Sequence, residues 1–191
     1  CSGDQPETRT GKLMPLHFFR KITTLLLLLT WTATAWAETG VEPRRVVLGS
    51  HQPLTGPASE FSASGRAAQV WFQYVNDLGG IHGRQVELRI RDDRLQPERA
   101  LEAIRTLVVQ DQVFALFASM GKRTHAAAQP VWASFQLPDF FVQSNAPEWT
   151  DPARPGVFAL EPTPAIEARV LGQYLLREHG GERIAVWHTQ A

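Results

Sequence analysis

Apolar residues between positions 38 and 191 follow two alternating patterns, short continuous runs and longer stretches with helical spacing. The first run, Val46-Val47-Leu48, has no polar interruption, which predicts a strand buried on both faces. Pro53, Gly56 and Pro57 cannot continue this strand. The chain must therefore turn over the carboxyl end of the strand.

A stretch with apolar residues three and four apart follows this loop. It predicts an amphipathic helix that packs its apolar side on the core and ends at Gly79-Gly80. Its apolar positions are Ala67, Val70, Trp71, Tyr74, Val75 and Leu78. Val86, Leu88 and Ile90 then alternate with charged residues, which predicts a strand with one solvent-facing side near a sheet edge.

Helices and strands continue to alternate along the rest of the chain. The expected elements are a helix over residues 97–108, strands over 113–118, 140–142, 157–160 and 184–187, and further helices over 124–135 and 164–179. Strands separated by helices of this length run parallel, with right-handed crossovers. The expected fold class is therefore α/β, an open parallel sheet with helices on both faces.

The loops at the carboxyl ends of the strands hold the candidate ligand-binding residues. In sheets of this class the second strand lies on one side of the first and the third on the other, which leaves a crevice between strands one and three. The loops bordering it supply hydroxyls, backbone N–H groups and a helix N-terminus, which suit a carboxylate or another anion. An ordinary turn, an N-cap and a solvated loop would explain the same residues, so both interpretations stay open. The candidates are Thr55, Gly56, Phe61, Ser119, Met120, Gly121, Lys122, Gln143, Ser144 and Asn145.

The titratable residues form no catalytic or metal-binding motif. Asp92 and Asp93 are neighbours at a strand end and point to opposite faces, so we interpret them as turn-forming residues. The six histidines lack metal-ligand spacing, and we expect each of them at the surface or in a loop. Cys1, the only cysteine, can form neither an intrachain disulfide nor a zinc site. We expect a protein that is not an enzyme and needs no cofactor or metal.

Composition and charge narrow the class of partner. Of the 191 residues, 43% are hydrophobic and 20% are charged, values typical of a globular protein. Lys plus Arg and Asp plus Glu each number 19, so no basic excess favours nucleic acid. We expect a monomer that binds a small molecule and no nucleic acid.

Residues 14–37 have the features of a cleavable signal peptide. Met14 precedes a short basic region, five consecutive leucines begin at Leu25, and Ala35-Trp36-Ala37 suits a signal peptidase. The alternative is an uncleaved membrane anchor, but the apolar core is nearer about 10 residues than the roughly 20 that span a bilayer. We expect export to the periplasm, a mature chain from Glu38, and disorder over residues 1–13.

Three spaced motifs carry a family resemblance. They are Pro53-Leu54-Thr55-Gly56-Pro57, the run from Asn76 to Arg84, and Asp92-Asp93 followed by Pro97 before a helix. Together they resemble the type I periplasmic binding proteins, and most closely the Leu/Ile/Val substrate-binding branch of ABC importers. The resemblance runs from about Arg45 to the end of the chain. It implies two α/β lobes that close on a ligand, with residues 38–182 as the first lobe and residues 183–191 as the start of the second.

The resemblance also implies roles for the loop residues. Phe61 matches the aromatic residue after the first strand, residues 119–122 match the loop that holds the ligand carboxylate, and residues 143–145 match the next loop. Lys122 stands where the family commonly has a small hydroxyl residue, and Leu95 stands near a position where some members have a disulfide cysteine. The departure at Lys122 bears on which ligand is bound.

The resemblance implies an exported solute-binding protein that presents a small polar ligand, such as an amino acid, to an ABC permease in the membrane. In that family the lobes close around the ligand and no bond is made or broken. A sensory ligand-binding domain of the same fold is the first alternative. An exported α/β enzyme is the second, and it would need a catalytic cluster that this sequence does not contain.

Overall fold

The structure, a computed structural model, describes residues 38–187. The expected signal peptide (residues 14–37), the segment 1–13 and the last residues 188–191 lie outside the described part. Five parallel strands form one sheet in the order β2-β1-β3-β4-β5. The strands are β1 (Arg45–Gln52), β2 (Gln85–Asp92), β3 (Ala115–Phe117), β4 (Asp139–Val142) and β5 (Val157–Ala159). The predicted fold class and the placement of β2 and β3 on opposite sides of β1 are confirmed.

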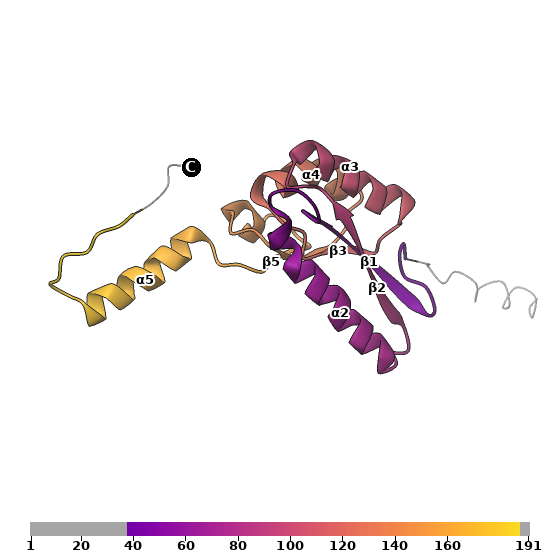
Figure 1. The fold of residues 1–191 in the computed structure, drawn as a ribbon, viewed down its shortest axis with the longest axis horizontal. Helices are drawn as coiled ribbons and strands as arrows, with labels where there is room; N and C mark the ends of the chain where they lie inside the picture. Colours follow the sequence, from indigo (N-terminus) through magenta and orange to yellow (C-terminus); the bar gives the residue numbers. More distant parts are fainter. Residues whose placement is uncertain (1–37, 188–191) are drawn as a thin grey trace, which may run out of the picture. The chain divides into compact units, whose positions relative to one another are not determined.

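Helices cover both faces of the sheet, as Figure 1 shows. On one face lie α3 (Pro97–Arg105), which continues into a π-helical turn η2 (Thr106–Gln110), and α4 (Lys122–Ser134). The opposite face carries α2 (Ala63–Asp77). The remaining elements are the 3-10 turns η1 (Ser59–Ser62) and η3 (Pro147–Thr150) and the helix α5 (Pro164–Glu178).

The core lies between the sheet and the α3–α4 layer. Its buried side chains come from alternate positions of the strands and from the facing helices: Val47, Ile104, Leu107, Val108, Val113, Leu116, Ala128, Trp132, Val142, Ala146 and Trp149. Val46 and Leu48 point to the other face, where they line an apolar hollow with Phe72 and Phe117. They are only partly buried in the described residues, so the prediction that the first strand is buried on both faces is wrong.

The predicted apolar face of α2 does not pack on the core. Val70 and Trp71 are 71% and 61% exposed. Instead α2 attaches to the edge strand β2 through a polar side chain: the Asn76 amide donates to the Val86 carbonyl (2.9 Å) and accepts from the Val86 N–H (2.8 Å). A side-chain amide can pair with both the N–H and the carbonyl of one residue in an edge strand. The spacing of apolar residues does not reveal such a contact.

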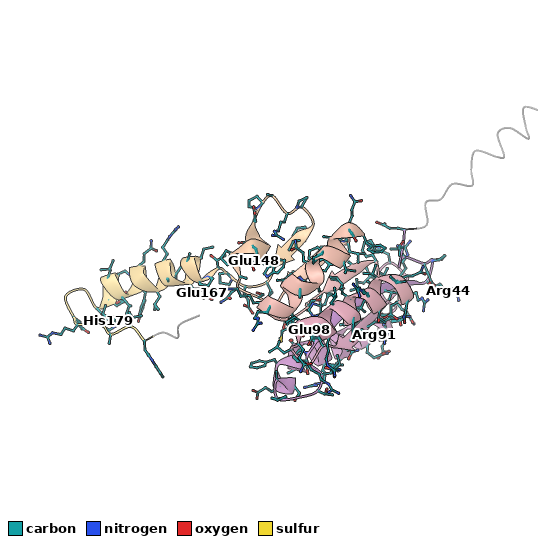
Figure 2. The ribbon with its side chains drawn as sticks, turned by 90° about the horizontal axis from the view of Figure 1, so that it is seen from above. Arg44, Arg91, Glu98, Glu148, Glu167 and His179 are labelled. Carbon is teal, nitrogen blue, oxygen red and sulfur yellow. The ribbon has the colours of Figure 1, made fainter. Side chains whose placement is uncertain are left out.

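The last part of the described chain differs from the prediction in one respect. Helix α5 is present, and the Thr163 hydroxyl accepts a hydrogen bond from the Ile166 N–H at its start. It buries none of its side chains; Figure 2 labels Glu167 in its first turn and His179 just after its end. The strand expected over residues 184–187 is absent from the described residues, which place no neighbouring strand there to pair with it.

Candidate ligand-binding rim

The loops after β1, β3 and β4 lie side by side at the carboxyl edge of the sheet. The Met120 N–H donates to the His51 carbonyl at the end of β1 (3.2 Å), and the Gln143 N–H donates to the Ser119 carbonyl (2.9 Å). The Gly121 N–H donates in turn to the Gln143 carbonyl (3.3 Å). The loops after β3 and β4 therefore meet each other and the end of β1, whereas these bonds do not include residues 53–56, the predicted loop after β1.

The loop between β3 and α4 presents a polar group at the start of a helix. Ser119 has no exposed surface, and its hydroxyl has no hydrogen-bond partner. Gly121 is the N-cap of α4 and provides no side chain to cap it. Lys122 is exposed as the first residue of α4. A buried hydroxyl, an uncapped helix N-terminus and a cation together favour an anionic ligand.

The backbone at Gly121 leaves no room for a side chain. Its φ of 99° is in the left-handed region, and a Cβ there would lie 2.3 Å from the Thr124 Oγ1. The Thr124 hydroxyl donates to the Met120 carbonyl (2.8 Å), which holds the loop in this shape. Glycine at this position is therefore required by both conformation and contact.

The other loops contribute polar groups of different accessibility. The Ser64 hydroxyl at the start of α2 donates to the Gln143 side-chain oxygen (2.9 Å), which joins α2 to the rim. Ser144 is buried, whereas Asn145 is exposed. Gln52 is fully buried and donates its amide to the Ala118 carbonyl (2.8 Å). Sequence reasoning did not select Gln52, because it lies inside the strand and not in the loop.

Thr55 and its neighbours turn toward β2 rather than toward Ser119. The Thr55 hydroxyl and N–H both donate to the Asp92 carboxylate at the end of β2. Gly56 has a left-handed φ of 88°, and Phe61 in η1 is 56% exposed. Burial raises the pKa of Asp92. The hydrogen bonds from Thr55, together with backbone bonds from Arg94 and Leu54, lower it by more than burial raises it, so the pKa is below its ordinary value. Asp92 thus fixes the turn, as predicted for a turn-forming residue.

Two histidines contradict the expectation of surface or loop positions. His51 in β1 and His125 in α4 have no exposed surface. His51 contacts Asp93 (Nδ1 to Oδ2, 2.7 Å) and His125 contacts Asp139 (Nε2 to Oδ2, 2.6 Å). Asp93 is therefore also more than a turn residue. A usable signal existed for His125, since it shares its helical stripe with the buried residues Ala128 and Trp132 at spacings of three and seven.

Burial away from water shifts the pKa of His51. Burial is the largest effect and lowers the pKa of His51 below its ordinary value of 6.5, against the opposing effect of its hydrogen bond to Asp93. Within residues 38–187 no group of three or more metal-ligating side chains has a geometry that could hold a metal ion.

Comparison with known proteins decides the family. A model of the family described as periplasmic binding protein matches residues 45–190. The chain belongs to this family. It is a family of binding proteins and not of enzymes. No helix among the described residues combines the length and apolarity needed to cross a membrane.

Two curated relatives match most of this periplasmic binding protein's chain. It is 26% identical over 139 residues to the leucine-, isoleucine-, valine-, threonine- and alanine-binding protein of Pseudomonas aeruginosa, covering 72% of this chain and 37% of that protein. It is 29% identical over 151 residues to the Leu/Ile/Val-binding protein homolog 3 of Brucella melitensis, covering 76% and 39%. The chain thus spans about two fifths of the length of these relatives.

Solved structures agree in fold. The TM-score is 0.64 with a possible leucine/isoleucine/valine-binding protein from Rhodopirellula baltica, at 19% identity, covering 76% of this chain and 38% of that one. It is 0.62 with a substrate-binding periplasmic protein from Ralstonia solanacearum, at 26% identity and covering 70% and 38%. It is also 0.62 with the branched-chain amino acid transporter substrate binding protein LivJ from Streptococcus pneumoniae in complex with isoleucine, at 18% identity and covering 71% and 39%.

Proposed function

We propose that this periplasmic binding protein captures a small polar ligand, such as an amino acid, outside the cytoplasmic membrane and presents it to an ABC permease. Residues 38–182 would form one of two ligand-binding lobes, and residues 183–191 would begin the second. Closure of the lobes on the ligand would provide the signal that the permease recognises.

The observation that carries the proposal is the unpartnered hydroxyl of Ser119 at the rim. A buried hydroxyl without a hydrogen-bond partner costs about 1–3 kcal/mol, which a ligand oxygen could recover. Ser119 lies two residues before Gly121, the N-cap of α4, and its carbonyl accepts from the Gln143 N–H in the next loop. A ligand carboxylate would meet hydrogen-bond donors and the positive end of the helix dipole there. The relatives named for leucine, isoleucine and valine support an amino acid as the ligand class.

Isothermal titration of the full-length protein with a panel of amino acids, amides and small carboxylates tests the proposal. At least one should release or absorb heat with a stoichiometry of one. Ser119→Ala should weaken that ligand about 10-fold or more, because a hydrogen bond to a charged group contributes roughly 1.5–3 kcal/mol.

The matched control is Ser134→Ala, which removes an exposed hydroxyl near the other end of α4. It should leave the affinity unchanged. Absence of heat with every compound of the panel, or equal effects of the two serine variants, would contradict the proposal.

A further inference from the structure

Four buried ionisable side chains lie in one unbroken line between the sheet and α4. None of the four has exposed surface: Asp93 directly follows β2, His51 is in β1, His125 is in α4 and Asp139 is in β4. Hydrogen bonds join Asp93 Oδ2 to His51 Nδ1 (2.7 Å), His51 Nε2 to His125 Nδ1 (2.9 Å), and His125 Nε2 to Asp139 Oδ2 (2.6 Å). Neither the family assignment nor the proposed function accounts for this line.

The number of protons in the line follows from the number of its hydrogen bonds. Three bonds need three hydrogens, and two neutral imidazoles supply only two. If both histidines were neutral and both aspartates ionised, each imidazole would donate to its own carboxylate. The nitrogen lone pairs of His51 and His125 would then face each other at 2.9 Å. A third proton is therefore required, and it leaves the line with one negative charge.

A third proton on an imidazole would leave three buried charges, whereas a third proton on a carboxylate leaves one, so burial favours the carboxylate. The surroundings then decide which carboxylate stays ionised. The Asp93 carboxylate accepts a second hydrogen bond, from the Leu95 N–H to its Oδ1 (2.8 Å). The Oδ1 of Asp139 is buried and has no partner. A buried carboxylate is ionised more readily where more donors surround it, so the charge belongs on Asp93 and the third proton on Asp139.

We propose that these four side chains form a directional chain of three protons that fixes the rim loops in place. Asp139 donates to His125 Nε2, His125 Nδ1–H donates to His51 Nε2, and His51 Nδ1–H donates to ionised Asp93. Both histidines are neutral in this arrangement, which agrees with the lowered pKa of His51.

The line is joined to the Ser119–Gly121 loop through the backbone of its two histidines. The backbone carbonyl of His51 accepts from the Met120 N–H (3.2 Å), and the backbone N–H of His125 donates to the Gly121 carbonyl (3.0 Å). Side-chain hydrogen bonds that fix the two histidines therefore also fix both sides of the loop. His125 is itself held by aromatic rings, with ring centroids 5.6 Å from Trp132 and 4.7 Å from Trp149. The positioning role rests on the proposed function of the rim, whereas the proton count does not.

A distinctive pH dependence follows from this count. The charged groups that act on His51 are its partners in the line, Asp93, His125 and Asp139. The folded line holds three protons. Above about pH 6.5 the unfolded chain holds only two on these groups, so stability falls as pH rises; below about pH 6.5 it holds four, so stability falls as pH decreases. The contribution of the line to stability is therefore greatest near pH 6.5.

The test uses the full-length protein without ligand, so that it is independent of the proposed function. Asp139→Asn places an amide N–H donor opposite His125 Nε2 and keeps the chain of hydrogen bonds, but it removes the third titrating proton. Between about pH 7.5 and 9, the unfolding equilibrium constant of the wild type should rise tenfold per pH unit relative to this variant. Asp93→Asn keeps the third proton, so it should retain the dependence of the wild type over this range. A wild type and an Asp139→Asn variant with parallel pH profiles would overturn the proposal.

Nitrogen-15 NMR of the imidazole rings supplies a second readout that needs no variant. Both His51 and His125 should be neutral and should carry their proton on Nδ1. An imidazolium at either residue, or a proton on Nε2 of His125, would overturn the direction of the chain. Ligand titration of the wild type at pH 6.5 and 8.5 tests the proposed function alone. Absence of a binding signal there would contradict ligand binding and would leave the proton count, which the unfolding and NMR experiments test, unaffected.

Discussion

At the scale of single residues, Gly121 occupies the most constrained position of the rim. Gly79 has a similar left-handed φ (105°, against 99° at Gly121), but no atom lies within 4 Å of a Cβ built there. The two glycines therefore separate the cost of conformation from the cost of contact. This pair gives a direct measure of how tightly the loop is packed.

Gly121→Ala should lower the free energy of unfolding by about 1 kcal/mol more than Gly79→Ala, because only the first adds a clash with Thr124 to the strain at positive φ. Chemical denaturation of both variants measures the difference. Equal losses would show that the loop can move away from the added methyl group.

The Thr55 hydroxyl is one of the donors that lower the pKa of Asp92 at the end of β2, against the opposing effect of burial. The folded pKa of Asp92 is lowered below its ordinary value of 3.8, so its contribution to stability is present above pH 3.8 and is lost as pH falls through the folded pKa. Thr55→Val removes the hydroxyl donor and should raise the pKa of Asp92 toward 3.8, as measured by carboxyl carbon-13 titration. Thr150→Val, which removes an exposed hydroxyl bonded to Pro147, should leave this titration unchanged.

The sequence predicted which residues lie in the loops at the carboxyl edge of the sheet. Ser119 and Gly121 follow a strand and precede a helix, and the structure brings their loop against Gln143. The line of histidines was not predictable in the same way. His51 and His125 are 74 residues apart, and only the parallel arrangement of strands and helices brings their rings together.

At the scale of elements, α4 contains a residue that opposes its own helix. Pro130 lies inside α4, where proline removes one backbone hydrogen bond and crowds the preceding turn. Pro97, in contrast, is in the first turn of α3, where proline is tolerated. The two prolines therefore differ in what they cost the fold.

Pro130→Ala should stabilise the protein by about 1 kcal/mol or more, and Pro97→Ala should give no gain. Thermal unfolding followed by circular dichroism measures both. A lower melting temperature for Pro130→Ala would mean that neighbouring side chains depend on the distortion of α4 by Pro130.

Element types were predicted well by periodicity, and element faces less well. Every helix and strand expected between residues 45 and 179 is present, because short apolar runs and helical spacing differ clearly in this chain. The face of α2 was predicted wrongly, since Asn76 attaches the helix to β2 through its amide and leaves Trp71 in solvent. Periodicity shows that a helix has an apolar side, but it does not show what covers that side.

At the scale of the whole molecule, the sheet order followed from general rules for parallel α/β folds. The strand order β2-β1-β3-β4-β5 has its reversal at β1, and the loop after β3 meets the end of β1 through the hydrogen bond from Met120 to His51. The identity of the ligand was not predictable, because the described rim offers anion-binding groups that many small carboxylates would satisfy. The relatives are about twice as long as this chain.

The uncovered apolar side of α2 has a practical consequence for handling the protein. Val70, Trp71 and Tyr74 are all more than half exposed, and residues 38–191 hold 15 basic and 17 acidic residues, a small net charge. Exposed apolar patches favour association between molecules, and a small net charge gives little electrostatic repulsion to oppose it. A preparation of residues 38–191 should therefore scatter more light as its concentration is raised. Replacing Trp71 with arginine should delay the onset of turbidity as the concentration is raised.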